Sequence, residues 1–327
     1  MKKDINALLF GMPNCQKLAS KISKIINIPL STLTVTKFAD GEIMPVSDVA
    51  VRDKDVYVIA STSRPVNDNL MALYLFIDSL KRASAKSINV ALVYYGYARQ
   101  DRKASGRQPI GAKLIADFLQ TAGASKIIAV DLHNAAIQGF FDIPIDDLRA
   151  QFTLAKAIKK YHEKFNVVSP DHGGTVRARA LAELLSNDIK ISIIDKRRTD
   201  VNQTEVMGLI GDVNGHNAVI IDDIIDTGGT IMKAAETLKK HGAKKIIIAA
   251  THGIFSKGFE MFEQNPAIEK VIITDSIDNS DIENKFKKLE IVSLDDFLGG
   301  VINCSIQGKS ISSLYDKFTK EIKNNVK

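Results

Sequence analysis

The 327-residue sequence has no tryptophan, only two cysteines, and an aromatic content of 6%. Two cysteines, Cys15 and Cys304, are too few for a disulfide framework or a cysteine-rich metal site. No apolar run approaches the roughly 20 residues that a membrane helix requires. The apolar stretch after the first lysines is short and is interrupted by Gly11 and Pro13, which argues against a signal peptide. We therefore expect a cytoplasmic protein with no membrane segment.

A dense run of basic residues is also missing. The chain has 44 basic and 38 acidic residues, a net charge of +6 and a pI near 9.0. Because the basic residues are scattered, we expect no nucleic-acid partner, and small anionic substrates explain the charge at least as well. Hydrophobic residues at 45% and charged residues at 25% are ordinary for a globular enzyme.

Short apolar runs alternate with amphipathic stretches throughout, which predicts an α/β fold with parallel sheets covered by helices. The predicted strands include KDVYVIAST, INVALVYY, KIIAVDLH, FNVVSPD, ISIIDKRR, NAVIIDD, KKIIIAATH and EKVIITDS. The length favours two domains, with the best boundary near Asp147. We expect domains at 1–147 and 148–300, and a C-terminal segment, 301–327, that packs back on the first domain.

The two halves resemble each other. AGASKIIAVDLHNAAIQGF (122–140) aligns without gaps on HGAKKIIIAATHGIFSKGF (241–259). This favours internal duplication of one α/β domain, although helix–Gly-Ala–strand units in unrelated parallel sheets also converge. After a duplication the loops at equivalent sheet edges have diverged. The first half carries GYARQDRKASGRQPIGAK where the second carries DDIIDTGGT.

VIIDDIIDTGGTI (219–231) reads as a buried strand, an acidic pair, a glycine turn and the start of a helix. Backbone N–H groups and the helix dipole at such a turn can receive a phosphate. Carboxylates beside a phosphate repel it unless cations or sugar hydroxyls intervene. The stretch therefore indicates a ligand with phosphate, hydroxyls and a metal ion.

ARQDRK (98–103) places three cations and one carboxylate on a loop after a predicted strand. Arginine side chains suit the oxygens of a polyphosphate, although a charged run after a strand is often only a solvated loop. GRQPIGAK (106–113) lacks the Lys-Ser/Thr ending of a Walker A loop, and no true Walker A motif occurs elsewhere. A nucleotide bound here is therefore held in another way.

Two predicted strand ends carry metal-ligand types. VDLH (130–133) places Asp131 and His133 two residues apart, pointing the same way from a strand, as a pair for a divalent ion or as structural residues. VVSPDHGG (167–174) ends a strand in Asp171 before a glycine turn and a helix.

IIDKRR (193–198) places cations at the end of a further strand, before a weakly patterned stretch to Asp212 that we expect to be a mobile loop. Cations on a closing loop fit stabilisation of a phosphoryl-transfer transition state. A basic surface loop without a role in chemistry is the alternative.

In combination the motifs resemble one family. FADGE (38–42), VNDNLM (66–71), YARQDRK (97–103), DLH…IQGFFDIP (131–144), VVSPD (167–171), IIDKRR (193–198), DDIIDTGGTI (222–231) and THGIFS (251–256) stand in the order found in ribose-phosphate pyrophosphokinases. DDIIDTGGT alone indicates only the phosphoribosyltransferase fold, whereas YARQDRK with IIDKRR makes the resemblance specific. It implies two phosphoribosyltransferase-like domains related by duplication. The implied activity is that of a diphosphotransferase, which moves the β,γ-diphosphoryl group of ATP to the anomeric hydroxyl of ribose 5-phosphate and releases AMP.

The resemblance also implies roles for single residues. Catalytic cations are Lys196 and Arg198. The ATP site matches Phe38, Asp40, Gly41, Glu42, Arg99, Gln100 and Asp101. The ribose 5-phosphate site matches Arg198, Asp222, Asp223, Asp226, Thr227, Gly228, Gly229 and Thr230. The implied cofactor is Mg²⁺, with His133, Asp171 and Asp131 as candidate ligands.

A homo-hexamer regulated by phosphate as activator and ADP as inhibitor is a further implication. The matching effector residues are Arg52, Arg82, Ser310 and Ser312, although the serines also suit a helix cap. The chain departs from the family in three places: Ala50 replaces a serine, His172 replaces a small or apolar residue, and Asn134-Ala135-Ala136 follows DLH, where Gln often stands third.

Two other functions compete. A nucleobase phosphoribosyltransferase would need only the second half and leaves YARQDRK unexplained. A non-catalytic, regulatory relative of the kinase is expected to lose its cations or metal ligands, and this chain keeps them.

Overall fold

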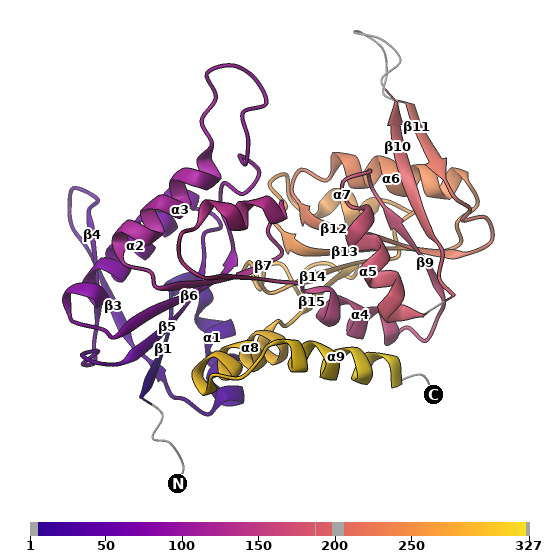
Figure 1. The fold of residues 1–327 in the computed structure, drawn as a ribbon. Helices are drawn as coiled ribbons and strands as arrows, with labels where there is room; N and C mark the ends of the chain where they lie inside the picture. The colour runs from indigo at the N-terminus through magenta and orange to yellow at the C-terminus, as the bar shows by residue number, and fades with distance from the viewer. Residues whose placement is uncertain (1–5, 187, 198–205, 325–327) are drawn as a thin grey trace. The chain divides into compact units, whose positions relative to one another are not determined.

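The computed structural model describes residues 6–186, 188–197 and 206–324 (Figure 1). The chain forms two compact units, each with its own sheet. The first comprises Met1–Arg149, Ser276–Asp278 and Leu294–Ile311; the second comprises Ala150–Asp275, Asn279–Ser293 and Ser312–Lys327. Within the described ranges, no helix is long and apolar enough to cross a membrane.

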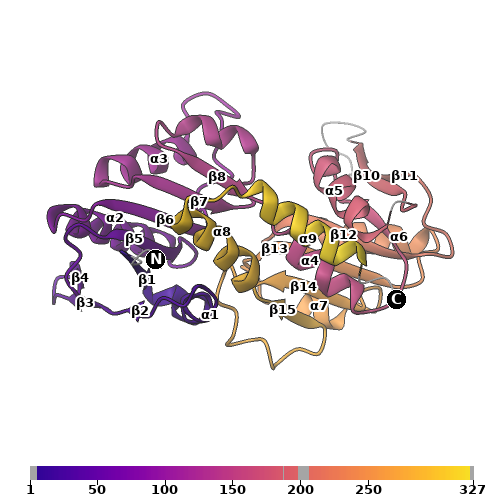
Figure 2. The same cartoon turned by 60° about the horizontal axis from the view of Figure 1, so that its bottom comes forward.

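The first unit is built on a six-stranded, all-parallel sheet of order β2-β1-β5-β6-β7-β8. Helices α2 and α3 cover one face, and α1 packs with α8 on the other (Figures 1 and 2). An antiparallel hairpin, β3–β4, lies beside α2. The elements are β1 (Ala7–Gly11), a 3-10 helix η1 (Pro13–Cys15), α1 (Gln16–Ile26), β2 (Leu30–Ser31), β3 (Leu33–Lys37), β4 (Ile43–Ser47), β5 (Asp55–Ser61), α2 (Val66–Arg82), β6 (Ser87–Tyr94), α3 (Gly111–Ala122), β7 (Lys126–Val130), a 3-10 helix η2 (Ala135–Phe140), β8 (Ile145–Leu148) and α8 (Asp295–Gln307).

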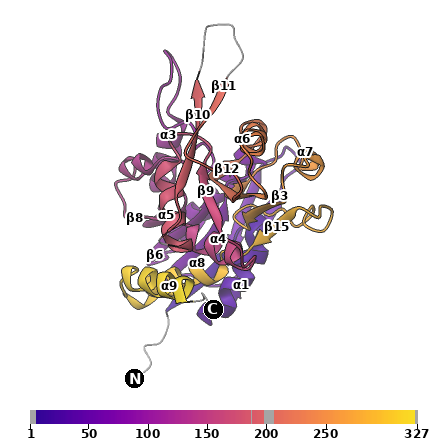
Figure 3. The same cartoon turned by 90° about the vertical axis from the view of Figure 1, so that its right-hand side faces the viewer.

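The second unit has a seven-stranded sheet of order β11-β10-β9-β12-β13-β14-β15, in which only β11 is antiparallel. Helices α4, α5 and α9 lie on one face, and α6 and α7 on the other (Figure 3). The elements are α4 (Gln151–Lys159), β9 (Phe165–Ser169), α5 (Thr175–Leu185), β10 (Ile191–Arg197), β11 (Val206–Ile210), β12 (Asn217–Ile225), α6 (Gly229–Lys240), β13 (Ile246–Gly253), α7 (Glu260–Gln264), β14 (Lys270–Thr274), β15 (Leu289–Val292) and α9 (Ser312–Asn324).

The central strands are buried on both faces, as their continuous apolar runs require. Ile220 of β12 and Ile248 of β13 are fully buried, as are Val58 of β5 and Val90 of β6. The predicted α/β class with parallel, helix-covered sheets is confirmed. The paired segments β6–α3–β7 and β12–α6–β13 both join parallel neighbours through one helix, which is consistent with duplication.

The expected segment 301–327 is divided between the units. Residues through Ile311, with α8, group with the first unit. Helix α9 instead belongs to the second unit, because its buried Phe318 and Ile322 cover α4. The Phe318 and Phe152 rings lie 6.1 Å apart. The apolar spacing of this helix is clear from the sequence, but the surface that receives it is not.

Candidate functional site

The turn after β12 has the predicted strand–turn–helix form. The strand is longer than expected and continues through Ile225, because Ile224 and Ile225 still pair with β13. Gly228 has φ +79°, and a Cβ there would lie 2.6 Å from a Phe262 ring atom. Gly229 begins α6, and a Cβ there would meet no atom within 4 Å. The space beside Gly229 at the start of α6 is therefore open, and a helix start of this kind can receive a phosphate.

The acidic pair, Asp222 and Asp223, lies within β12, and the side chain of Arg177 from α5 contacts both carboxylates. Arg177 Nη1 lies 3.4 Å from Oδ1 of Asp222 and 3.4 Å from Oδ1 of Asp223. Burial raises the pKa of Asp222 well above its ordinary value, and the neighbouring Asp223 raises it further, whereas Arg177 opposes the shift. A ligand that brings hydroxyl donors or a cation would relieve this crowding of buried acids.

The β9–α5 loop presents Asp171 at the start of a helix. Asp171 Oδ1 accepts a hydrogen bond of 3.0 Å from Gly174 N, and Ser169 Oγ donates to the Asp171 carbonyl at 2.6 Å. A Cβ at Gly174 would lie 2.7 Å from Ser169 Oγ, so the close loop requires glycine there. His172 reaches β10 through a contact of 3.1 Å between its Nε2 and Asp195 Oδ1.

The predicted catalytic cations, Lys196 and Arg198, come shortly after Asp195 in the sequence. Lys196 lies in β10, opposite Met207 of β11. Arg198 and the residues up to 205 lie outside the described residues. The stretch to Asp212 is not one continuous loop, because 206–210 forms strand β11. Backbone pairing with β10 outweighs the weak apolar pattern that suggested a loop.

In the first unit, a cavity of about 370 Å³ lies between the start of α2 and the loop after β6. The predicted Arg99 and Gln100 line it. Tyr97 Oη, beside them, donates a hydrogen bond of 2.6 Å to Asn67 Oδ1. A Cβ at Gly96 would lie 2.6 Å from the Thr62 carbonyl oxygen, so this loop can approach β5 only with glycine. The cavity has the cationic and amide groups that polyphosphate binding needs.

The Asp131 and His133 side chains do not share a strand face, so that sequence-based expectation is wrong. Strand β7 ends at Val130, and Asp131 has φ +44°. Asp131 is buried and lies 3.7 Å from Arg149 Nη1, whereas His133 is exposed. The positive φ breaks the alternation of side chains on which the expectation rested. Among the described residues, no group of three or more His, Cys, Asp or Glu side chains is arranged to hold a metal ion.

Four other predicted ATP residues, Phe38, Asp40, Gly41 and Glu42, lie at the tip of the β3–β4 hairpin. Phe38 N donates to the Glu42 carbonyl at 2.8 Å, and Glu42 N donates to Asp40 Oδ1 at 3.0 Å. Gly41 has φ +96°, which suits this tight turn. Phe38 is 45% exposed. None of these four is among the described residues that line the Arg99 cavity, so the structure does not bring the predicted ATP set together within one site.

The predicted effector residues are all exposed, and the two arginines among them contact different kinds of side chain. Arg52 Nη1 donates to Ser84 Oγ at 3.2 Å, and Arg82 pairs with Asp78 at 2.6 Å. Ser310 precedes α9, and Ser312 is its first residue, as expected of serines at a helix start. The Asp78 carboxylate beside Arg82 was not foreseen from the sequence.

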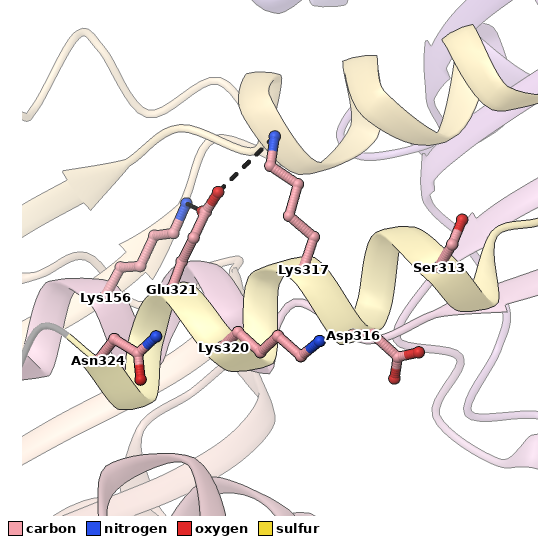
Figure 4. A pocket seen from close by; sticks show the side chains of 7 residues that line it. All are labelled: Lys156, Ser313, Asp316, Lys317, Lys320, Glu321 and Asn324. Atoms are coloured by element: carbon pink, nitrogen blue, oxygen red, sulfur yellow. Dashed lines mark ion pairs between the residues drawn. The ribbon is translucent and has the colours of Figure 1, made fainter.

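A hollow of about 910 Å³ lies along α9 and α4 (Figure 4). Its charges are largely paired: Glu321 lies 3.5 Å from Lys156 Nζ and 3.7 Å from Lys317 Nζ. The predicted site residues are absent from the described residues that line it. This surface of mixed charge, in which Lys156 and Lys317 both pair with Glu321, does not resemble an anion site.

Two site residues were missed by the sequence reasoning. Arg177 lies within helix α5, where its sequence surroundings do not distinguish it from other helical residues. The only indication in the sequence was that it follows Asp171 by six positions. Asn134 follows His133 and bonds to Asp101, and its position in a departure from the family pattern was the available signal.

Comparisons with known proteins agree over most of the chain. A family model described as the N-terminal domain of ribose phosphate pyrophosphokinase matches residues 7–123, and a phosphoribosyl transferase domain model matches residues 145–284. A ribose-phosphate pyrophosphokinase of Mycoplasmopsis pulmonis is 60% identical over 95% of this chain and 97% of its own length. One from Ureaplasma parvum is 43% identical over 98% of both. The crystal structure of phosphoribosylpyrophosphate synthetase from Mycobacterium smegmatis matches with a TM-score of 0.82 and 38% identity, over 93% of this chain and 99% of that one.

Proposed function

Because the chain belongs to the ribose-phosphate pyrophosphokinase family, we propose that it transfers the β,γ-diphosphoryl group of ATP to the anomeric hydroxyl of ribose 5-phosphate. The hydroxyl oxygen bonds to the β-phosphorus, the bond from that phosphorus to the α,β-bridging oxygen breaks, and the hydroxyl proton is lost. The products are 5-phospho-α-D-ribose 1-diphosphate and AMP. The observation that carries the proposal is 60% identity to a ribose-phosphate pyrophosphokinase over nearly the whole of both chains.

Ribose 5-phosphate is proposed to bind in the second unit. The open turn of Asp226, Thr227, Gly228, Gly229 and Thr230 supports this, since its N–H groups and the α6 dipole favour a phosphate. Asp222 and Asp223 would accept hydrogen bonds from the ribose hydroxyls. Arg177 would hold the two carboxylates in place through its contacts of 3.4 Å with each.

ATP is proposed to bind through the first unit. The cavity beside Arg99 and Gln100 supports binding of its phosphates, because an arginine fork can bond two oxygens at once. Asp101 stands next to them in the chain. Phe38, Asp40, Gly41 and Glu42 would recognise adenine through an aromatic face and hydrogen-bond acceptors.

Magnesium is the proposed cofactor, and the carboxylates among the predicted ligands are of a type that it takes. Mg²⁺ in proteins uses few carboxylates, keeps waters and takes its remaining ligands from substrate phosphates, so a dedicated cage is not required. His133 and Asp171 stay the predicted ligands, each described within its own unit, with Asp131 as a further candidate that the nearby Arg149 makes less available. When bound, the ion supplies positive charge to the phosphate oxygens. Lys196 and Arg198 would stabilise the charge of the transferring group.

The remaining features belong to the same proposal. We infer a homo-oligomer, with a hexamer as the expected state, and the exposed Phe38 and Met44 of the hairpin support contact with another copy. Phosphate and ADP are the expected effectors, acting at Arg52, Arg82, Ser310 and Ser312. Cytoplasmic location and the lack of a nucleic-acid partner also stay predictions.

The test supplies purified protein with ATP, ribose 5-phosphate and Mg²⁺ and follows AMP and phosphoribosyl pyrophosphate. Both products should form in equal amounts. Formation of a nucleotide from a free nucleobase and phosphoribosyl pyrophosphate would instead favour a nucleobase phosphoribosyltransferase. No product in either assay, with ligand binding intact, would favour a non-catalytic relative.

A further inference from the structure

The loops after β6 and β7 leave the same edge of the first sheet, because these strands are parallel neighbours (Figure 1). The Asn134 side chain bonds across them. Its Nδ2 donates a hydrogen bond of 2.6 Å to Asp101 Oδ2. Its Oδ1 accepts a hydrogen bond of 3.0 Å from Ala136 N and so caps the 3-10 helix η2.

Asn134 is a fixed point on its own loop. The segment before it is hydrogen-bonded to β8. Asp131 N donates to the Leu148 carbonyl at 2.8 Å, and Leu132 N donates to Asp147 Oδ1 at 3.1 Å. The cap fixes the segment after it. Because both ends of the Asn134 amide are engaged, its side chain has one favourable orientation.

The loop that receives this bond is attached to α3 through its backbone at Gln100, whose carbonyl accepts from Ala112 N at 3.1 Å. Residues beyond Asp101, from 102 to 110, are exposed. The Asp101 carboxylate is therefore a point at which the exposed loop is attached to the fixed one. Asp101 directly follows Arg99 and Gln100, and Asn134 directly follows His133.

We propose that Asn134 is a positioning residue that holds the Arg99–Asp101 loop at a set distance from the His133 loop. This inference rests on the proposed function, in which the first loop binds nucleotide phosphates and the second binds their metal ion. Asn134 touches neither ligand. Asn134 keeps the two loops in the arrangement that binds the metal–nucleotide complex. Binding of the complex then does not have to include the entropic cost of ordering the loops.

The test compares three variants of the full chain. Asn134→Ala loses both bonds. Asn134→Ser keeps an oxygen that can cap η2 but is too short to reach Asp101. Asn134→Asp keeps the shape and the cap, but places a second carboxylate beside Asp101. All three should lower kcat/KM for ATP by about 10-fold, the value of one hydrogen bond to a charged group at an exposed site, and Asp should be the most impaired.

The readouts separate positioning from folding. The KM for ribose 5-phosphate should stay unchanged in all three variants, and the unfolding midpoint should stay unchanged in the Ser and Asp variants, which keep the cap, while the Mg²⁺ concentration for half-maximal activity rises. Binding of Mg–ATP, followed by calorimetry without ribose 5-phosphate, should weaken by the same factor. A wild-type-like Asn134→Ser beside an impaired Asn134→Ala would assign the effect to the cap and overturn the proposal. Wild-type values for Asn134→Ala would also overturn it.

A double-mutant cycle gives an independent check. If Asn134 acts through Asp101, adding Asn134→Ala to Asp101→Ala should cause no further loss, whereas two additive losses would refute the link. Failure of the proposed reaction is distinguishable, because it would appear in the wild-type chain as absent AMP formation. The calorimetric comparison of wild type and variants remains decisive in that case.

Discussion

His172 Nε2 lies 3.1 Å from Asp195 Oδ1, so the imidazole joins the β9–α5 loop to strand β10. Asp171 directly precedes His172 in the chain, and Lys196 directly follows Asp195. The family usually has a small or apolar residue at position 172, which cannot form the link. A residue that departs from the family pattern thus connects two segments to which the resemblance gives functional roles.

His172→Ala should lower kcat/KM by about 2- to 10-fold, the effect of one ordinary hydrogen bond. The unfolding free energy should change by less than about 0.5 kcal/mol, because the ring is 65% exposed. His172→Gln, which can still donate to Asp195, should recover most of the loss. Steady-state kinetics would show this, with the exposed His216→Ala as control. Equal kinetics for wild type and His172→Ala would remove the link from function.

Lys196→Ala should lower kcat by about 10²–10³ with little change in KM for ATP, if Lys196 stabilises charge that develops only in the transition state. Lys190, just before β10, is exposed and carries the same charge, so Lys190→Ala is the matched control. Single-turnover measurements would separate the chemical step from product release. A variant with near-normal kcat would exclude Lys196 from the mechanism.

The two phosphate sites should be separable by mutation. Gly228→Val is a poor probe, because its side chain would meet Phe262 and a φ of +79° disfavours it. Gly229→Val places its side chain in open space and should weaken ribose 5-phosphate binding at least 10-fold while nucleotide binding survives. Arg99→Ala should do the reverse. Calorimetry that finds both variants impaired for the same ligand would contradict this division of labour.

The prediction from the sequence succeeded where the signal is local. Buried parallel strands appear as apolar runs, and glycines mark the turn after β12, so the fold class and the phosphate turn were predictable. The β3–β4 hairpin was not assigned, because its strands are half exposed and Pro45 interrupts the second. Strand β11 was missed because its pairing with β10 comes from tertiary context.

The site was less predictable than the fold. Arg177 reaches both acids from a helix, and a sequence gives no distance between a helical residue and a strand. Asp131 was misjudged because its φ of +44° is a backbone feature with no residue-type signal. The acids at 222 and 223 were identified, but their crowding depends on burial, which follows only from packing.

Asp222→Asn should stabilise the protein in the absence of ligands while abolishing most activity. Burial and Asp223 raise the pKa of Asp222, so the folded state binds the proton more tightly than the unfolded state. Folding is therefore weakened as pH rises through the unfolded pKa, and it stays weakened above the folded pKa.

At pH 7–8 the Asp222→Asn variant should melt at a higher temperature than wild type, and the difference should shrink as pH falls toward about 4, the ordinary range of an aspartate. Thermal unfolding without Mg²⁺ or phosphate measures this. Asp281→Asn, at an exposed position of the same unit, is the control and should show no such gain. A lower melting point for Asp222→Asn at neutral pH would mean that contacts with Arg177 outweigh the cost of burial.

Regulation by phosphate and ADP should differ between the wild-type chain and Ala50→Ser. Ala50 stands two residues before Arg52, at a position where the resemblance implies a serine, and the proposed effector site would then lack one hydroxyl contact to an oxyanion. A hydrogen bond to a charged group contributes roughly 1.5–3 kcal/mol, or about one to two decades in affinity. Because position 50 is exposed to solvent, we expect a change in effector affinity at the lower end of this range. We therefore expect Ala50→Ser to need about 10-fold less phosphate for activation and to be inhibited by about 10-fold less ADP. Activity is measured against both effectors, with exposed Ala104→Ser as a hydroxyl control on another loop. Identical curves for wild type and Ala50→Ser would show that position 50 does not line the effector site, and the assignment of Arg52 to that site would then lose its support.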